Sequence, residues 1–341
     1  MIANKEAETI SNDHKLEVAI VGLGKMGLLH GSLLNVFPSV HIAGLCDKSG
    51  LMRKIAKKTL KKILVTDKLD DLRSLSLDAI FITTPIPSHY SIIKEVFVKD
   101  ITRNVFVEKT LSSTYPESVE LFEMSKEFQR KTMVGYMKRF SVTFKKAKDL
   151  LNQQIIGKPI FFSAYAYSSD FVDAGKDASK ASARSGVLED LGSHIVDLAL
   201  WFFGDMKVNL AKTTVSNISG SLDSSSFDVV CSENLRGEFD VSWIKEGYRM
   251  PEFGINVIGS NGKLMVDDNE LKLELKKSVP KLWYRQDLND NIPFLIGDPE
   301  YYREDEHFIT SLISGSIPLT NFGTAMKVDL LLEEVRRVAN E

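Results

Sequence analysis

The stretch from Leu16 to Gly27 reads L-E-V-A-I-V-G-L-G-K-M-G and decides the fold of this 341-residue chain. Its first six residues are mostly apolar and rich in β-branched side chains, which predicts a short buried strand. Gly22, Gly24 and Gly27 come next, and leucines at 28, 29, 33 and 34 then recur with a helical period. Because glycine permits the tight turn between a strand and a helix, the stretch predicts the opening unit of a doubly wound α/β domain.

The same glycines have the spacing G-x-G-x-x-G, which predicts a dinucleotide site. The first glycine permits the turn, the second lets backbone approach a pyrophosphate, and the third permits close helix packing. The helix N-terminus attracts the anion. Alone, such glycines often serve packing only. The candidate cofactor residues in this loop are Gly22, Gly24, Lys25, Met26 and Gly27.

An acidic residue strengthens this interpretation. A second predicted strand, 40–46, ends at Asp47, which follows Gly22 by 25 positions, near the spacing of the carboxylate that binds the ribose hydroxyls. Asp47 could instead be a solvated turn residue. A carboxylate there would repel the 2′-phosphate of NADP(H), so we expect NAD(H), while Lys48 leaves NADP(H) open.

Composition excludes several classes of protein. The 43 Lys and Arg against 46 Asp and Glu give a net charge of −3, which argues against a nucleic-acid binder and a polybasic membrane-surface protein. No segment reaches the roughly 18–20 apolar residues of a membrane span, and the first fifteen residues lack the apolar core of a secretory signal. Cys46 and Cys231 form neither a disulfide framework nor a cysteine zinc site. We therefore expect a cytoplasmic protein without nucleic-acid or membrane partners.

The pattern of elements changes near residue 140. Before it, strands alternate with helical segments, which predicts a parallel sheet. The expected strands are 16–21, 40–46, 63–66, 79–83 and 104–107, with helices at 52–62 and from a Ser88 cap to Phe97. After it, helices at 143–153 and 187–203 flank an aromatic run, 160–167. Alternating segments then predict an antiparallel sheet; these are 228–232, 236–243, 255–258, 263–266 and 271–275, followed by helices at 303–314 and 322–339.

We therefore predict a polar tail over 1–15 and two domains. Residues 16–138 form a doubly wound α/β domain with a parallel sheet that binds the dinucleotide. Residues 139–341 form an α+β domain with a large, open, mostly antiparallel sheet that binds substrate and oligomerises. Residues 168–185, rich in Ser, Ala, Lys and Asp, predict a mobile loop that closes over substrate. Proteases should cut it at Lys176, Lys180 or Arg184 in the free enzyme.

Two places combine reactive side chains. The strand 104–107 ends at Glu108 and Lys109, and ligands of open α/β sheets bind beyond the carboxyl ends of strands. Lys109 would then project toward the cofactor, or it could be a surface lysine paired with Glu108.

The second place is the segment 186–197. At 100° per residue, Asp190, His194 and Asp197 lie within about 60° on one stripe of a helix. Asp190 and His194 form an i,i+4 pair, in which the carboxylate can orient the imidazole. The alternative is a solvated stripe with a satisfied histidine. We expect no metal here, because neither neighbourhood supplies the further His or Cys that a zinc site usually has.

The motifs together resemble the glucose–fructose oxidoreductase / inositol dehydrogenase (Gfo/Idh/MocA) family over residues 16–340. They are G-L-G-K-M-G at 22–27, T-T-P-x-x-x-H at 83–89, V-E-K-T at 107–110, V-G-Y-M-K-R-F at 134–140 and G-V-L-E-D-L-G-S-H-I-V-D at 186–197. The resemblance implies a Rossmann domain, a sheet domain that often forms dimers or tetramers, and NAD(P)-dependent redox chemistry on sugars, inositols or nucleotide sugars.

The resemblance also implies roles for single residues. Lys109 matches the lysine of the family's E-K-P motif, and Asp190 and His194 match its D-x-x-x-H pair at the hydride-transfer site. Further implied cofactor contacts are Thr84, Pro85, His89 and Glu108, beside the glycines and Asp47.

Departures from the family pattern are also present. Thr110 replaces the usual proline and Ile86 the usual asparagine, which bears on how nicotinamide is held. Ser185 replaces a glycine, and a Trp-Arg pair that is common in the family is missing before it. The resemblance therefore does not identify the substrate. The intact lysine, aspartate and histidine indicate an active enzyme.

The side chains suggest a mechanism. His194, with a reference pKa of about 6.5, suits the removal of a hydroxyl proton near neutrality. We expect Asp190 to fix its tautomer and Lys109 to polarise the reacting oxygen; the reverse assignment of Lys109 and His194 is the alternative. Arg139, Tyr165 and Tyr167 are candidate contacts for substrate hydroxyls, although aromatic strand residues more often pack a sheet.

Three classes of function follow. The leading one is an NAD(H)-dependent sugar or polyol dehydrogenase that forms a homodimer or homotetramer. The second is glycosidic cleavage or epimerisation by transient oxidation with tightly held NAD. The third is a nucleotide-sensing protein without catalysis.

Overall fold

The computed structural model of the chain describes residues 15–172, 184–215, 221–290, 292 and 298–341. The predicted N-terminal tail, apart from Lys15, and the centre of the predicted loop 168–185, with Lys176 and Lys180, lie outside these residues. No helix of the described part is both long and apolar enough to cross a membrane.

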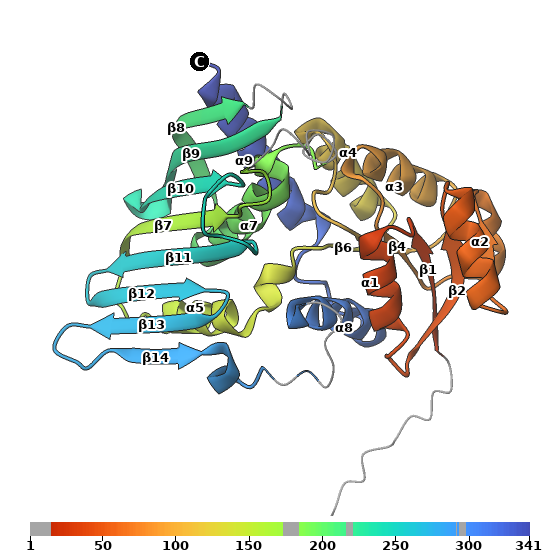
Figure 1. Cartoon of the computed structure of the whole chain (residues 1–341), viewed down its shortest axis with the longest axis horizontal. Helices are drawn as coiled ribbons and strands as arrows, with labels where there is room; N and C mark the ends of the chain where they lie inside the picture. Colours follow the sequence, from red (N-terminus) through yellow and green to blue (C-terminus); the bar gives the residue numbers. More distant parts are fainter. Residues whose placement is uncertain (1–14, 173–183, 216–220, 291, 293–297) are drawn as a thin grey trace, which may run out of the picture.

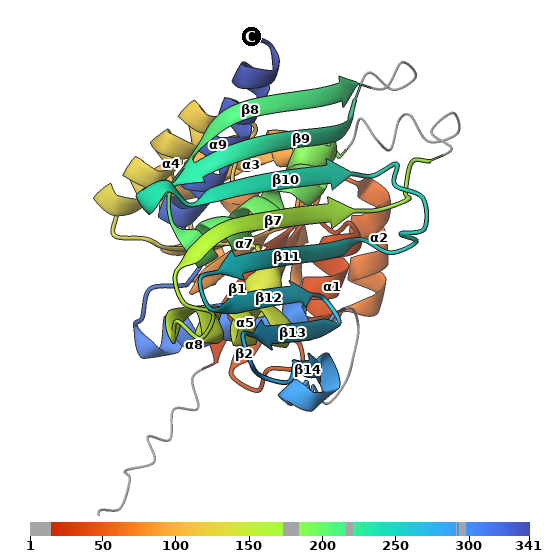
Figure 2. The same ribbon diagram turned by 90° about the vertical axis from the view of Figure 1, so that its left-hand side faces the viewer.

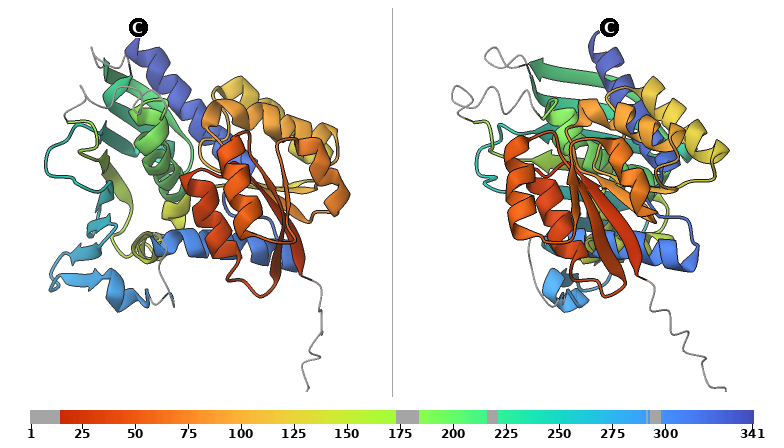
Figure 3. Two further views of the ribbon diagram at one scale, coloured as in Figure 1. Left: turned by 45° about the vertical axis from the view of Figure 1, so that its right-hand side comes forward. Right: turned by 90° about the vertical axis from the view of Figure 1, so that its right-hand side faces the viewer.

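The first domain is built on a six-stranded parallel sheet in the order β3-β2-β1-β4-β5-β6, with helices on both sides (Figure 3). This confirms the predicted doubly wound fold. Its strands are β1 (Leu16–Val21), β2 (Val40–Cys46), β3 (Leu64–Thr66), β4 (Ala79–Ile82), β5 (Asn104–Val107) and β6 (Lys131–Val134). Its helices are α1 (Lys25–Leu34), α2 (Gly50–Thr59), α3 (His89–Val98) and α4 (Tyr115–Glu127), with short 3₁₀ turns at Leu69–Leu75 and Ile86–Ser88.

The second domain is built on an eight-stranded sheet in the order β14-β13-β12-β11-β7-β10-β9-β8. Only the β7–β10 pair is parallel, so the predicted mostly antiparallel sheet is confirmed. The strands are β7 (Pro159–Tyr167), β8 (Met206–Val215), β9 (Leu222–Cys231), β10 (Arg236–Ser242), β11 (Glu252–Gly259), β12 (Gly262–Asp267), β13 (Glu270–Leu275) and β14 (Lys281–Tyr284). Further 3₁₀ turns are Met137–Phe140, Ser232–Asn234 and Arg285–Leu288.

Helices cover only one face of this sheet. Figures 1 and 2 show α5 (Val142–Asn152), α7 (Ser193–Phe203) and α9 (Phe322–Ala339) between the sheet and the first domain, with the opposite face uncovered. Because only one face is covered, buried and partly exposed residues alternate along β7. Phe162, Ala164 and Ala166 are buried, and their neighbours are partly exposed.

The C-terminal helices reach back to the first domain. Phe308 and Ile309 of α8 (Pro299–Ser314) share a hydrophobic core with Val18 and Phe106 of the first sheet. The division at residue 138/139 therefore separates the two sheets, while α8 belongs to the core of the first domain.

One local expectation is wrong. Ser88 does not cap α3 through its side chain; its hydroxyl donates to Thr84 Oγ1 and to the carbonyl of Pro85 instead. The predicted helix 187–203 is confirmed, but its first part, Leu188–Gly192, is a wide π-helical turn before α7.

Candidate active site

The three loop glycines have three different surroundings. Gly22 has a φ of +96°, and a Cβ there would lie 2.8 Å from Thr84 Cγ2. A Cβ on Gly27 would lie 1.8 Å from the carbonyl oxygen of Gly22, whereas one on Gly24 would meet no atom within 4 Å. The loop thus has a turn that glycine adopts without strain, a close helix approach and one open stretch of backbone. This is the geometry that a bound pyrophosphate needs.

Asp47 lies against this loop. Its Oδ2 accepts a hydrogen bond from the backbone N–H of Leu23 at 2.5 Å, and its Oδ1 accepts one from Ser49 at 2.6 Å. Arg53 was not anticipated from the sequence. Its Nη1 donates to the carbonyl oxygens of Asp47 and Lys48 at 2.7 and 2.9 Å, so this guanidinium braces the end of β2.

Lys109 and Asp190 meet although they are far apart in sequence. Lys109 Nζ donates to Asp190 Oδ1 at 3.0 Å and to the Asp190 carbonyl at 2.6 Å. Arg184 donates to Asp190 Oδ2 at 3.2 Å. Burial alone would raise the pKa of Asp190, but the charges of Lys109 and Arg184 lower it. Asp190 is therefore an ionised carboxylate that fixes the lysine ammonium.

His194 lies in an apolar setting. Its ring contacts Tyr136 and Phe253 edge-on, at centroid distances of 6.2 and 5.5 Å. Burial, followed by the charges of Lys109 and Lys138, lowers the pKa of His194 well below its usual range. The imidazole is therefore neutral near pH 7.

The expected contact between Asp190 and His194 is absent. His194 Nδ1 has no hydrogen-bond partner in the described chain, and both Asp190 oxygens bind cations. The expectation assumed regular α-helical spacing, whereas Asp190 lies in the π-helical turn. Asp190 consequently positions Lys109 and not the histidine.

Three candidate substrate contacts face elsewhere. Arg139 is buried and binds both Asp197 oxygens at 2.7 Å, so neither residue lines an open site. Tyr165 and Tyr167 point away from the helices, toward the uncovered face of the sheet. They donate to Glu252 at 2.9 Å and Asp240 at 2.6 Å. None of these three side chains lines the cleft between the domains, so the structure gives no support to them as substrate contacts.

Two candidate cofactor contacts are buried. The ring nitrogens of His89 lie 2.8 Å from the carbonyl oxygen of Thr110 and 2.7 Å from that of Thr84. This histidine ties the loop after β4 to the loop after β5. Glu108 Oε1 lies 2.9 Å from His30 Nε2, and Oε2 accepts a bond from Lys109 N–H. His89 and Glu108 therefore support the loops of the site through buried hydrogen bonds. The other two candidate cofactor contacts are more accessible, because Pro85 is exposed and Thr84 half-buried.

A cleft of about 750 Å³ lies between the two domains. Lys25 and Met26 of the glycine loop line one side, and Lys138 and Phe253 line the other. Lys138 was missed from the sequence; its Nζ donates to Asp268 Oδ1 at 2.7 Å. That partner comes from a turn 130 positions later, so no local signal could have identified the pair.

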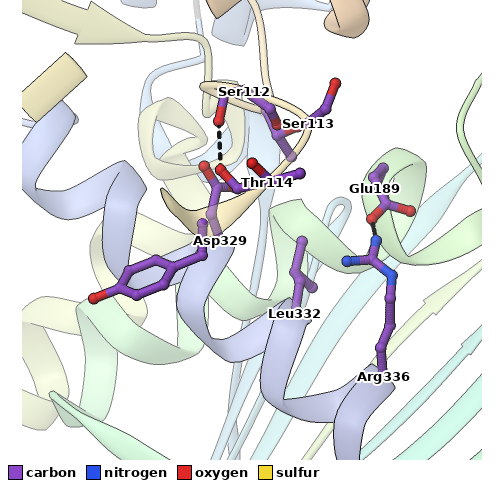
Figure 4. A pocket seen from close by; sticks show the side chains of 9 residues that line it. Ser112, Ser113, Thr114, Glu189, Asp329, Leu332 and Arg336 are labelled. Atoms are coloured by element: carbon purple, nitrogen blue, oxygen red, sulfur yellow. Dashed lines mark hydrogen bonds and ion pairs between the residues drawn. The ribbon is translucent and has the colours of Figure 1, made fainter. Parts of the chain in front are cut away.

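A second contact fixes the segment that carries Asp190. Figure 4 shows the carboxylate of Glu189 meeting the guanidinium of Arg336, which α9 supplies. Asp329, two turns earlier on the same face of α9, accepts a hydrogen bond from Ser118 Oγ at 2.5 Å. The C-terminal helix thus holds both the π-helical turn and the first domain.

Family models match most of the chain. One, described as an oxidoreductase family with an NAD-binding Rossmann fold, matches residues 16–136. Another, described as the GFO/IDH/MocA C-terminal domain, matches residues 144–265.

Relatives with curated names include inositol dehydrogenases. The scyllo-inositol 2-dehydrogenase (NAD(+)) of Bacillus subtilis is 27% identical over 195 residues, 56% of this chain and 55% of that protein. The chain thus spans about half the length of this curated relative.

Solved structures share the whole architecture. The WlbA dehydrogenase from Bordetella pertussis, in complex with NADH and UDP-GlcNAcA, has a TM-score of 0.82 and 18% identity over 96% of this chain and 97% of that chain. Levoglucosan dehydrogenase, in complex with NADH and levoglucosan, has a TM-score of 0.85 and 18% identity over 96% and 98%. At these identities the likeness establishes the fold.

Proposed function

Since the chain belongs to the Gfo/Idh/MocA family of NAD-binding oxidoreductases, we propose that it transfers hydride between NAD(H) and a hydroxyl or keto carbon of a sugar, inositol or nucleotide sugar. The observation that carries this proposal is the Lys109–Asp190 contact beside a neutral His194. The names of the relatives support the substrate class, because they act on inositols or were solved with sugars.

The residues at the site divide the work of the reaction. Bound NAD(H) supplies or accepts the hydride. The Lys109 ammonium, held by Asp190, stabilises negative charge on the reacting oxygen. The neutral His194 has a lone pair with which to accept the hydroxyl proton, and the same ring returns it in the reverse direction. The exchanged assignment, with Lys109 moving the proton, is tested by the pH dependence below.

A substrate panel tests the function. Inositols, free aldoses, anhydrosugars and nucleotide sugars are each incubated with NAD⁺, and NADH absorbance is followed. We expect at least one class to turn over with the unmodified protein and not with Lys109→Ala. NADH binding without turnover on any member would favour the sensing role instead, and NAD retained through purification would favour transient oxidation.

The proposal also includes the oligomeric state and the cellular compartment of the protein. The uncovered sheet face carries exposed apolar residues near its edge, such as Leu210 of β8 and Val230 of β9, which supports a homodimer or homotetramer through this face. Light scattering on a size-exclusion column measures the number of subunits, and a monomer at micromolar concentration would contradict this part. Cys46 and Cys231 are free and buried, which suits a cytoplasmic protein.

A further inference from the structure

A group of buried ionisable side chains lies where α8 packs against α1, outside the proposed active site. We call it the α1–α8 cluster; it consists of His30 from α1, Glu108 after β5, and Glu304 and Asp305 from α8. His30, Glu304 and Asp305 are completely buried. Figure 1 shows α8 beside α1, and Phe308 of α8 belongs to the core beneath the sheet.

The hydrogen bonds of the cluster are incomplete. His30 Nδ1 lies 2.8 Å from Asp305 Oδ1, and Nε2 lies 2.9 Å from Glu108 Oε1. Neither oxygen of Glu304 has a hydrogen-bond partner among the residues that the structure describes, and nor has Asp305 Oδ2. Buried polar atoms are rarely left in this state, so three converging oxygens call for a ligand.

The charges of the cluster are also unbalanced. Three carboxyl groups face one imidazole, so their full ionisation would leave a net charge of −2 even with a doubly protonated His30, and burial accordingly raises the pKa of Glu304 and of Asp305. The neighbouring Arg285 and Arg303 form their ion pairs with Asp290 and Glu300 instead. Protonating Glu304 would remove one charge, but its O–H would then need an acceptor, and the structure shows no hydrogen bond from Glu304 to any described residue.

One ligand atom from each of His30, Glu304 and Asp305 lies within 4.8 Å of the others. We propose that the α1–α8 cluster binds one divalent transition-metal ion through His30, Glu304 and Asp305. Two carboxylate oxygens with one imidazole nitrogen suit Zn²⁺ or Mn²⁺. The ion takes the place of the proton between His30 and Asp305, so binding releases a proton. It joins α8 to α1 and has no part in hydride transfer.

Direct binding measurements test the proposal. The full-length protein is treated with a chelator, dialysed, and titrated with ZnCl₂ or MnCl₂ alone, by calorimetry and, for Mn²⁺, by electron paramagnetic resonance. We expect one saturable site per chain and a higher melting temperature with the metal. Glu304→Gln and Asp305→Asn should each weaken binding by more than about 100-fold, since losing even a supporting residue costs 10–100-fold.

A matched control separates this site from adventitious binding. Glu306→Gln changes an exposed carboxylate on the same helix and should leave the affinity unchanged. Absence of a saturable site in the unmodified protein would overturn the proposal, as would full affinity in a folded Glu304→Gln variant. Because the readout is metal binding, the result does not depend on the proposed dehydrogenase activity.

Discussion

At the residue scale, Lys109 and His194 each have one chemical role in the proposed reaction. Lys109→Ala removes the charge at the reacting oxygen, and His194→Ala removes the proton acceptor. Each change should lower kcat by about 10²-fold or more, while the Kd for NADH changes little. Steady-state kinetics and fluorescence titration measure the two quantities, with Lys126→Ala on the exposed face of α4 as the control. Near-normal kcat in both variants would remove these residues from the site.

The pH dependence of alcohol oxidation identifies the proton acceptor. Burial and the neighbouring lysines lower the pKa of His194, so its imidazole stays neutral down to a pH below its ordinary value of about 6.5. If His194 accepts the proton, kcat/KM loses activity on acidification only below about pH 6.5. A profile that shows no loss of kcat/KM on the acid side would contradict this role of His194.

Cofactor choice depends on Asp47. Its carboxylate already faces the glycine loop, where it can accept ribose hydroxyl hydrogen bonds worth about 1.5–3 kcal/mol each. We expect NADH to bind at least about tenfold tighter than NADPH, a difference of 1.4 kcal/mol. Asp47→Ser should narrow or reverse this preference. Fluorescence titration with both cofactors measures it, with Asp149→Ser, an exposed aspartate on α5, as the control. Equal binding by the unmodified protein would contradict this role.

At the scale of elements, two glycine-to-alanine substitutions test the different surroundings of the glycines between β1 and α1. Gly24→Ala places a methyl group in open space, so it should change stability by less than about 0.5 kcal/mol and still weaken NADH binding. Gly27→Ala pushes a methyl group onto the Gly22 carbonyl, so it should cost about 1–3 kcal/mol of unfolding free energy. Urea unfolding and NADH titration separate the two effects. A similar stability loss in both variants would contradict the different surroundings of these glycines.

The individual elements also show how much of the fold and of the site the sequence could predict. β1, β2 and β5 have the predicted bounds, because apolar runs that end at glycine or charge are strong local signals. β6, K-T-M-V, was missed because only its last two residues are apolar, whereas β5, N-V-F-V, has three in a row. The π-helical turn carries no local signal, and the expected Asp190–His194 contact was wrong for that reason. Arg139–Asp197 and Lys138–Asp268 are likewise long-range pairs that only the folded chain brings together.

At the scale of the whole molecule, α9 connects the domains through a titratable carboxyl. Burial raises the pKa of Asp329, whose partner is Ser118 on α4, to about 7 from 3.8 in the unfolded chain. Between those two values the native state keeps a proton that the unfolded state releases. The free energy of unfolding therefore falls as pH rises through this window, by about 4 kcal/mol in all.

Asp329→Asn should remove most of that pH dependence and stabilise the protein above pH 7. Chemical unfolding at several pH values measures the effect, with the exposed Glu333→Gln on the same helix as the control. An unchanged slope in Asp329→Asn would show that the carboxyl is ionised in the native state.

The position of α8 has a consequence for biosynthesis. Phe308 and Ile309 complete the core against Val18 and Phe106, although all strands of the second sheet lie between these residues along the chain. Domains near the N-terminus usually fold first as the chain emerges. Here part of one apolar side of the first sheet stays uncovered until the second sheet and α8 have also been synthesised. Chaperones that shield emerging strands would meet this protein for longer than one whose nucleotide domain is closed by its own residues.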